Sequence, residues 1–364
     1  MEKLLYKIAL TKIPKVGAKT ARELVSYCGG VENVFHASKK DLLNIPGVGS
    51  QIAKCVLQQN VLAIAERELQ FIEKHAIQPL FFLDKDYPAR LKHYSDSPVM
   101  LYYKGNADLN HGRVIAIVGT RKPTARGVAN CEQLIEDLRP YQPLIISGLA
   151  YGVDITAHRK SLEMGIETIG VMGHGLNQIY PPSHRRTASQ MTENGGLLTE
   201  YTHDVGVDPR HFPMRNRIIA GLCDALVVVE TKNSGGSMIS AKIANNYNKD
   251  VFAFPGRISD KSAEGCNKLI KSHKAALMES AADIAYVMRW EKSDSQRAIQ
   301  KQLFVELSER EQKVVSLLRT SDSVSIDKIV YEQQLSTSEA AAVLLELELK
   351  GLVKPQPGNR FVLI

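Results

Sequence analysis

The sequence predicts an α/β protein whose central domain is a Rossmann-like, doubly wound and mostly parallel sheet. An all-α domain precedes this sheet and a winged-helix domain follows it. Three observations lead to the prediction: strand-like apolar runs alternate with helical segments between residues 111 and 290, a turn-and-helix phrase is repeated within residues 1–75, and residues 305–364 have the pattern of three helices followed by a β-ribbon. Alternation of strands and helices is typical of parallel sheets with right-handed crossovers.

Length and composition indicate a globular protein with several domains. The 364 residues exceed what one ordinary core contains, and 44% hydrophobic with 23% charged residues is a usual globular balance. The longest apolar runs have the length of strands, so we expect no membrane span. Five cysteines are scattered without a Cys-x-x-Cys pair, which argues against a metal site or a disulfide framework and favours the cytoplasm.

The first predicted domain, residues 1–75, contains an internal repeat. Segment 13–17 (Ile-Pro-Lys-Val-Gly) recurs as segment 45–49 (Ile-Pro-Gly-Val-Gly), and each copy is a tight turn that precedes a helix. We expect two helix-hairpin-helix units (a SAM-like domain), whose backbone N–H groups can hold a DNA phosphate without reading sequence. A helical pair used only for packing or protein contact is the alternative. Residues 76–110 have no core of their own, so we expect them to form an extension packed on the next domain.

The second predicted domain, residues 111–290, contains the sheet. Strands are expected at Val114–Val118, Leu144–Ser147, Thr168–Met172, Leu197–Glu200, Ala225–Glu230 and Val251–Phe254. Helices are expected at Arg126–Leu138, Val153–Glu163, His184–Glu193 and Gly236–Asn246, with a further helical segment at Ile218–Leu222. The period of apolar residues switches between strand and helix along this stretch, as it does in βαβ units.

The end of the chain is predicted to be a polar linker, residues 291–304, and a winged-helix domain, residues 305–364. Segment 336–339 (Ser-Thr-Ser-Glu) has the pattern of a capping box at the start of the third helix. This helix corresponds to the recognition helix of DNA-binding winged-helix proteins, but it carries Glu339, Glu346 and Glu348 against one lysine, Lys350. Because these carboxylates would repel a DNA groove, the pattern favours protein contact or support of the fold.

Candidate binding residues lie where predicted strands end or helices begin. Carboxyl ends of parallel strands gather at one edge of a sheet, where ligands bind, and glycines and free helix N-termini at that edge favour anions. Arginines add bidentate donors for phosphate oxygens, so we expect Arg121, Arg215 and Arg217 to surround one phosphate pocket. The candidate DNA-binding residues are Gly119, Thr120, Arg121, Ser147, Gly148, Arg185, Arg186, Phe212, Arg215, Asn216, Arg217, Gly235, Gly236 and Ser237.

These phrases resemble the DNA-processing protein A (DprA/Smf) family. The matching segments are 118–121 (Val-Gly-Thr-Arg), 147–154 (Ser-Gly-Leu-Ala-Tyr-Gly-Val-Asp), 173–176 (Gly-His-Gly-Leu), 180–181 (Tyr-Pro), 212–217 (Phe-Pro-Met-Arg-Asn-Arg), 234–237 (Ser-Gly-Gly-Ser) and 254–256 (Phe-Pro-Gly). The resemblance implies a cytoplasmic protein that binds single-stranded DNA in natural transformation, forms a homodimer through the Rossmann-like domain and loads the RecA recombinase. It implies DNA contacts at Arg121, Phe212, Arg215 and Arg217, and no catalytic residue, metal or cofactor. Arg185 and Arg186 follow the position where the family often has a lysine.

Two other functions compete with this interpretation. One is a nucleotide-binding or phosphoribohydrolase-like enzyme on the same fold, but segment 234–241 lacks the glutamate that such a family uses, and there is no P-loop. The other is an adaptor that has lost its ligand. Phe212 is either a stacking surface for a base or a core residue. Asp154 and His158, four residues apart on a predicted helix, are expected to share a hydrogen bond rather than to bind a metal.

Overall fold

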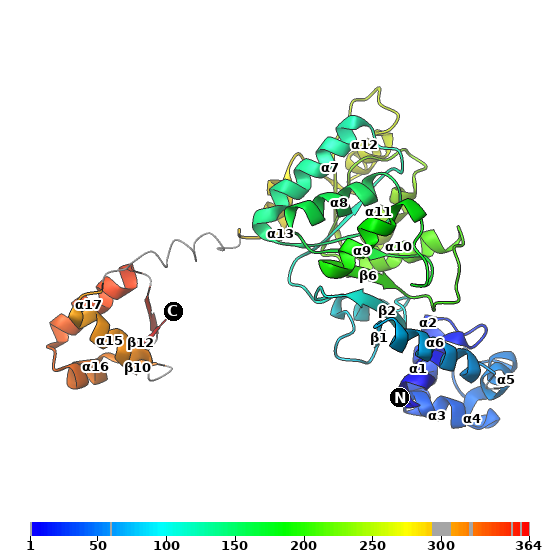
Figure 1. Cartoon of the computed structure of the whole chain (residues 1–364), viewed down its shortest axis with the longest axis horizontal. Helices are drawn as coiled ribbons and strands as arrows, with labels where there is room; N and C mark the ends of the chain where they lie inside the picture. Colours follow the sequence, from blue (N-terminus) through cyan, green and yellow to red (C-terminus); the bar gives the residue numbers. More distant parts are fainter. Residues whose placement is uncertain are drawn as a thin grey trace. The chain divides into compact units, whose positions relative to one another are not determined.

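A computed structural model of the chain describes residues 2–58, 60–292, 307–319, 323–350, 352–356 and 359–363. The chain divides into two compact units, Met1–Lys292 and Ser293–Ile364, and the ribbon of each can be followed in Figure 1. Most of the predicted linker, from residue 293 to residue 304, lies outside the described residues. Among the described residues, every helix is too short or too polar to cross a membrane.

The first unit begins with a bundle of short helices. These are α1 (Glu2–Lys12), α2 (Ala18–Cys28), α3 (Val31–His36), α4 (Lys39–Leu43), α5 (Ser50–Gln58) and α6 (Leu62–Lys74). The two repeated turns join α1 to α2 and α4 to α5. Lys15 has φ +65° and Gly47, its counterpart in the second copy, has φ +80°. Both turns therefore use the left-handed backbone conformation, although a lysine adopts it less easily than a glycine.

A nine-stranded sheet forms the centre of the first unit. Its strands are β1 (Gln78–Phe81), β2 (Met100–Gly105), β3 (Val114–Val118), β4 (Leu144–Ser147), β5 (Thr168–Val171), β6 (Gly195–Thr199), β7 (Ala225–Val228), β8 (Asp250–Ala253) and β9 (Ala276–Leu277), in the order β1-β2-β6-β5-β4-β3-β7-β8-β9. Strands β3 to β9 run parallel, while β2 pairs antiparallel with β1 and with β6. Residues 76–110, which we expected to be an extension packed on this domain, thus supply two strands of its sheet, β1 and β2.

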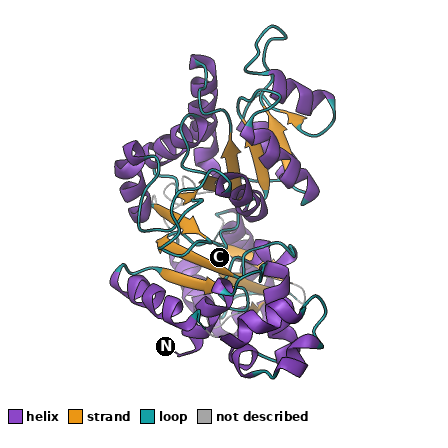
Figure 2. Ribbon diagram, turned by 90° about the vertical axis from the view of Figure 1, so that its right-hand side faces the viewer, coloured by secondary structure: helices purple, strands orange, loops and turns teal. Residues whose placement is uncertain are grey.

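Helices cover both faces of this sheet (Figure 2). They are α7 (Ala125–Leu138), α8 (Val153–Met164), α9 (Arg185–Glu193), α10 (His211–Leu222), α11 (Gly236–Asn246), α12 (Glu264–Lys271) and α13 (Ala281–Met288), with 3₁₀ turns η1 (Ala89–His93), η2 (Arg139–Tyr141) and η3 (Pro182–His184). Alternate residues of β3 enter different cores: Val114, Ala116 and Val118 pack on one face, and Ile115 and Ile117 on the other. The fully apolar strands predicted from the sequence are therefore buried on both sides, as in other parallel sheets.

Helix α10 starts earlier than predicted. The helical segment was expected at Ile218–Leu222, after the phrase at 212–217, but α10 runs from His211, so the phrase lies within it. Pro213 is tolerated because the first turn of a helix has no backbone acceptor for its missing N–H.

The second unit has the winged-helix arrangement. Its elements are α15 (Glu309–Arg319), β10 (Val324–Ser325), α16 (Ile326–Gln333), α17 (Thr337–Leu349), β11 (Val353–Gln356) and β12 (Arg360–Leu363), with the strands in the order β10-β12-β11. The predicted capping box is present, since the Ser336 and Glu339 side chains bond reciprocally to each other's backbone N–H. Several cations of this unit are paired with carboxylates: Lys350 with Glu311 at 2.5 Å, Arg310 with Glu339 at 3.3 Å and Lys328 with Glu332 at 3.7 Å.

The segment between β6 and α10 is held by the helical bundle. Buried Glu68 of α6 accepts the backbone N–H of His203 at 2.9 Å and also contacts its ring. Phe71 stacks on the same ring with centroids 4.5 Å apart, and Lys12 of α1 pairs with Asp204 at 2.9 Å. The bundle thus fixes the first part of the loop that connects β6 to α10.

Candidate functional site

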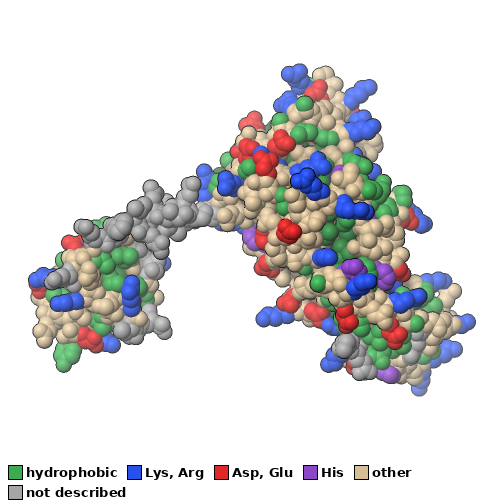
Figure 3. Space-filling view, viewed as in Figure 1, with side chains coloured by type: hydrophobic (Ala, Val, Ile, Leu, Met, Phe, Trp, Pro, Cys, Tyr) green, Lys and Arg blue, Asp and Glu red, His purple; other side chains and the backbone are tan. Residues whose placement is uncertain are grey.

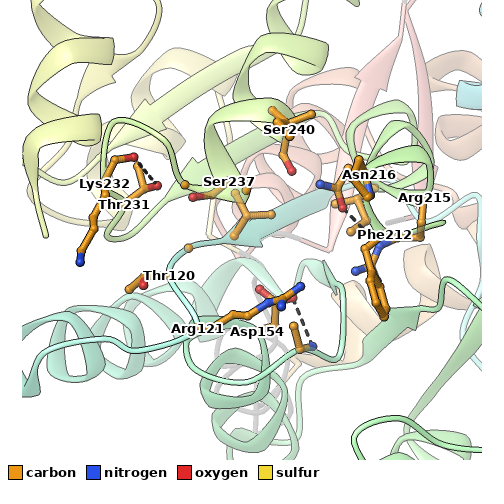
Figure 4. Close-up of a pocket in the computed structure, with 18 of the residues that line it drawn as sticks. Thr120, Arg121, Asp154, Phe212, Arg215, Asn216, Thr231, Lys232, Ser237 and Ser240 are labelled. Carbon is orange, nitrogen blue, oxygen red and sulfur yellow. Dashed lines mark hydrogen bonds between the residues drawn. The ribbon is translucent and has the colours of Figure 1, made fainter. Parts of the chain in front are cut away.

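A cavity of about 570 Å³ opens at the carboxyl ends of β3 and β7. The strand order reverses here, because β4 lies on one side of β3 and β7 on the other, and ligands of doubly wound sheets bind at such a switch point. Figure 4 shows the surrounding side chains. The predicted residues that line the cavity are Gly119, Thr120, Arg121, Phe212, Arg215, Asn216, Gly235, Gly236 and Ser237.

Arg121 lies on the rim of the cavity. Its side chain is exposed, and among the described residues it forms no ion pair. Its guanidinium lies 5.7 Å from the centroid of the Phe212 ring, which is a cation–π distance. Gly152, with φ +78°, lets the loop after β4 approach, since a Cβ there would lie 2.3 Å from the Thr120 carbonyl oxygen. This loop contact positions a guanidinium that is available to a ligand.

The N-terminus of α11 forms the opposite wall. Its N-cap, Gly235, has no side chain to accept the first backbone N–H groups, so these groups are available to an anion. Ser237 is 6% exposed and its Oγ has no hydrogen-bond partner among the described residues. Lys232, in the loop before this helix, is exposed and also lines the cavity. A ligand with oxygen acceptors would satisfy both the helix end and the hydroxyl.

Arg215 forms the floor of the cavity and is 4% exposed. Its Nη1 donates to the Gly148 carbonyl oxygen at 2.7 Å and to that of Val171. It therefore ties the loop after β4 to the carboxyl end of β5. Burial lowers the pKa of Arg215 to about 10, although the Asp154 carboxylate acts in the opposite direction. At neutral pH this guanidinium remains charged and adds positive potential under the cavity.

Asp154 also lines the cavity, which the sequence analysis did not anticipate. Burial raises its pKa and Arg215 lowers it, while its carboxylate accepts the Ala150 N–H at 3.3 Å. The expected hydrogen bond to His158 is wrong. The His158 Nδ1 instead pairs with the Thr168 Oγ1 at 2.7 Å, and burial lowers the pKa of this histidine to about 3.

Arg217 does not line the cavity, contrary to expectation. Its Nη2 donates to the Glu200 Oε2 at 2.5 Å, and both side chains are largely buried. Residues two apart on an α-helix point about 200° apart, so Arg215 and Arg217 cannot both face one pocket once the phrase is helical. The charge of Arg217 serves an internal ion pair.

Four more candidates lie outside the cavity. Ser147 is fully buried and donates to the Ile117 carbonyl oxygen at 2.6 Å. Gly148 lies beneath the floor, where a Cβ would come within 2.6 Å of Arg215 and of Asp154. Arg185 and Arg186 are exposed in the first turn of α9.

Tyr180 is a cavity residue that sequence reasoning missed. Its ring stacks on Phe212, with centroids 6.0 Å apart and an angle of 29° between the planes. It lies in the loop after β5, and only the pairing of β5 with β4 brings this loop to the cavity. Two aromatic rings beside a guanidinium offer flat surfaces on which nucleic-acid bases stack.

The structure gives no support to a nucleotide site at the first strand–helix junction. There the Glu230 carboxylate accepts the Thr124 backbone N–H at 2.9 Å and its hydroxyl at 3.1 Å. It lies so close that a Cβ on Gly127 would be 1.9 Å from its oxygen. The end of α7 that holds a pyrophosphate in dinucleotide-binding folds is thus occupied by a side-chain carboxylate.

A doubly wound sheet with a basic, aromatic cavity at its switch point, joined to helix-hairpin-helix and winged-helix elements, defines a class of multidomain proteins with a Rossmann-like centre. Comparison with known families makes this specific: residues 78–289 match the DNA recombination-mediator protein A family, and the chain belongs to it. Residues 301–359 match the DprA winged helix domain, and residues 8–59 match a helix-hairpin-helix motif.

Individual relatives agree with this assignment. The chain is 31% identical to Protein Smf of Synechocystis over 98% of both chains. It is 38% identical to DNA processing protein DprA of Streptococcus pneumoniae, over 62% of this chain and 82% of that protein. The X-ray structure of the pneumococcal protein has a TM-score of 0.69 at 33% identity, covering 79% of this chain and 98% of that one.

A second solved structure concerns the ligand. DNA processing protein A from Helicobacter pylori has a TM-score of 0.54 at 28% identity, covering 59% of this chain and 97% of that one. Its structure was described for a single-stranded DNA binding mode of that protein.

Proposed function

We propose that this protein binds single-stranded DNA in the cavity between β3, α10 and α11, protects the incoming strand in natural transformation and loads the RecA recombinase onto it. The observation that carries the proposal is the exposed guanidinium of Arg121, which has no ion pair among the described residues and lies beside the Phe212 ring. The proposal includes no catalysis, metal or cofactor.

The chemistry of the cavity suits a sugar–phosphate chain. A single strand needs a positive groove for phosphates and flat surfaces for bases. Arg121 and Lys232 supply exposed charge, the α11 N-terminus with Ser237 supplies neutral donors, and Phe212 with Tyr180 supplies stacking surfaces. Asp154 opposes a phosphate, but the buried charge of Arg215 offsets it.

Other parts of the proposal are supported by family membership rather than by the cavity. We propose a homodimer through the Rossmann-like domain and a cytoplasmic location. Two cavities on one strand would raise the apparent affinity through effective concentration. The winged-helix unit, whose third helix carries Glu339, Glu346 and Glu348, is proposed to contact protein rather than DNA.

The first test measures the affinity for fluorescent oligo-dT by anisotropy at several salt concentrations. For an oligonucleotide short enough to fill only the cavity, two exposed cations that each neutralise one phosphate predict a slope of log K against log salt of about −1.4. Arg121→Ala should reduce this slope by about 0.7. Arg139→Ala, an exposed arginine before the amino end of β4, is the matched control and should leave the slope unchanged. A salt-independent affinity would contradict the proposal.

The same preparation separates the competing functions. Release of base or phosphate from AMP at a reproducible rate would favour the phosphoribohydrolase-like enzyme. A failure to bind oligo-dT at low salt would favour an adaptor. RecA loading requires its own assay, in which the protein should shorten the lag of RecA filament formation on DNA covered by single-strand-binding protein.

A further inference from the structure

Two exposed tyrosines lie in loops that follow neighbouring strands at the carboxyl edge of the sheet. Tyr151, in the loop after β4, is 49% exposed, and Tyr180, in the loop after β5, is 44% exposed. Strands β4 and β5 are paired neighbours, so the two loops are adjacent. Tyr180 stacks on Phe212 inside the cavity. Tyr151 lies farther along, with its ring 4.9 Å from that of His184 and its hydroxyl accepting from the Ser183 Oγ at 3.5 Å.

Three arginines lie nearby, one in the middle of α8 and two in the first turn of α9, which begins directly after His184, the residue whose ring contacts Tyr151. Arg159, Arg185 and Arg186 are exposed, and among the described residues none forms an ion pair. Arg159 donates to the Thr187 Oγ1 at 3.5 Å, which places it against the first turn of α9. Figure 3 shows lysine and arginine side chains gathered over α8 on the face in view. The neighbouring Lys160 differs, because it pairs with Glu136 at 2.6 Å and Glu163 at 3.0 Å.

Stability of the fold does not account for this arrangement. Arg185 and Arg186 occupy the first turn of α9, where a cation opposes the helix dipole. Tyr151 exposes half of its surface although its ring is large and apolar. Exposed aromatic rings beside cations that form no ion pair are the pattern that proteins use to follow a single strand of nucleic acid.

We propose that a bound single strand continues past the cavity, over Tyr180 and Tyr151, to the cluster of Arg159, Arg185 and Arg186. This inference rests on the proposed function and adds the path of the strand. One base stacks on Tyr151, and the phosphates that follow meet the three guanidinium groups. Each protomer therefore binds a longer stretch of DNA than its cavity holds.

The length of DNA distinguishes the two parts of the site. Affinity is measured by fluorescence anisotropy with the full chain and oligo-dT of about 4 to about 16 nucleotides, the range of single-strand site sizes in other proteins. For the unaltered protein, affinity should increase with length beyond the shortest oligonucleotide. Tyr151→Ala and the double variant R185A/R186A should each lose about tenfold in affinity for the longest oligonucleotide, and almost none for the shortest.

Controls separate stacking, charge and folding. Tyr151→Phe keeps the ring and should bind all lengths as the unaltered protein does. Lys160→Ala removes a neighbouring cation that is already paired and should have no effect. Thermal unfolding checks that each variant is folded, which we expect because the altered side chains are exposed.

Failure of this inference differs from failure of the proposed function. If the shortest oligonucleotide binds and requires Arg121, but Tyr151→Ala and R185A/R186A match the unaltered protein at every length, the extended path is wrong. If these variants lose affinity equally at all lengths, the residues belong to the cavity and the extended path is again wrong. If no oligonucleotide binds at low salt, the proposed function itself fails.

Discussion

The exposed rim of the cavity and the buried layer of side chains around it both contain an arginine, but the two arginines have opposite surroundings. Arg121 on the rim is exposed and has no ion pair among the described residues. Arg217 belongs to the buried layer, where its side chain is largely buried and paired with Glu200. Arg215 shares one property with each of them: it is buried, as Arg217 is, but its guanidinium donates to carbonyl oxygens rather than to a carboxylate oxygen. The difference teaches that pairing and burial, more than residue type, separate a ligand-binding cation from a structural one.

The largest effect should come from the buried ion pair. Arg217→Ala leaves the Glu200 carboxylate buried without its partner, which should lower the free energy of unfolding by about 3–5 kcal/mol. Denaturant unfolding measures this loss. Oligo-dT affinity, measured where the variant is still folded, should change less than about twofold, since this side chain does not line the cavity. A large loss of affinity in the folded variant would break the distinction between the two layers.

The rim should show the reverse behaviour. Arg121→Ala should lower oligo-dT affinity more than tenfold, or by more than about 1.4 kcal/mol, while the free energy of unfolding changes by less than about 0.5 kcal/mol. Arg121→Lys keeps the charge but loses the bidentate geometry, so it should recover only part of the affinity. The contrast would be lost if Arg121→Ala unfolded the protein or left its affinity intact.

The buried layer should also respond to acid. The pKa of His158 is lowered by burial from 6.5 to about 3, so the unfolded chain takes up a proton in this range and the folded chain does not. Stability should therefore fall as pH decreases from about 6.5 towards 3, by up to about 1.4 kcal/mol per pH unit from this group. His158→Gln should have a shallower dependence of the unfolding free energy on pH. An unchanged slope would show that other groups dominate.

The smallest effect should come from the winged-helix unit. Arg310 is exposed and pairs with Glu339 at 3.3 Å, and exposed pairs contribute little. Arg310→Ala should leave oligo-dT affinity within about twofold and the unfolding free energy within about 0.5 kcal/mol. A strong loss of affinity would mean that this unit binds DNA, in spite of its acidic third helix.

Several features could be predicted from the sequence because they follow from local pattern. Apolar runs predicted the parallel strands β3 to β8, and a Ser-x-x-Glu pattern predicted the cap of α17. Arg121 and Ser237 were placed at the cavity by the rule that ligands bind where parallel strands end.

Other features depend on contacts that no local pattern contains. The direction of the Arg217 side chain depends on segment 212–217 being helical, whereas the sequence analysis placed the helical segment after it. Its partner Glu200 comes from a distant part of the sequence. Tyr180, in the loop after β5, and Asp154, in the first turn of α8 after β4, enter the cavity only because β4 and β5 are neighbours in the sheet. The hydrogen bond between His158 and Thr168 likewise joins a helix to a strand.

The contacts between the helical bundle and His203 have a practical consequence for deletion experiments. Removal of the first 75 residues would take away the contacts that Glu68, Phe71 and Lys12 make with the loop between β6 and α10. If such a shortened chain bound DNA weakly, the cause could be a displaced Phe212, just past the end of this loop, as well as the loss of a DNA contact made by the bundle itself. Point changes on the outer surface of the bundle are the cleaner way to ask whether its hairpins touch DNA.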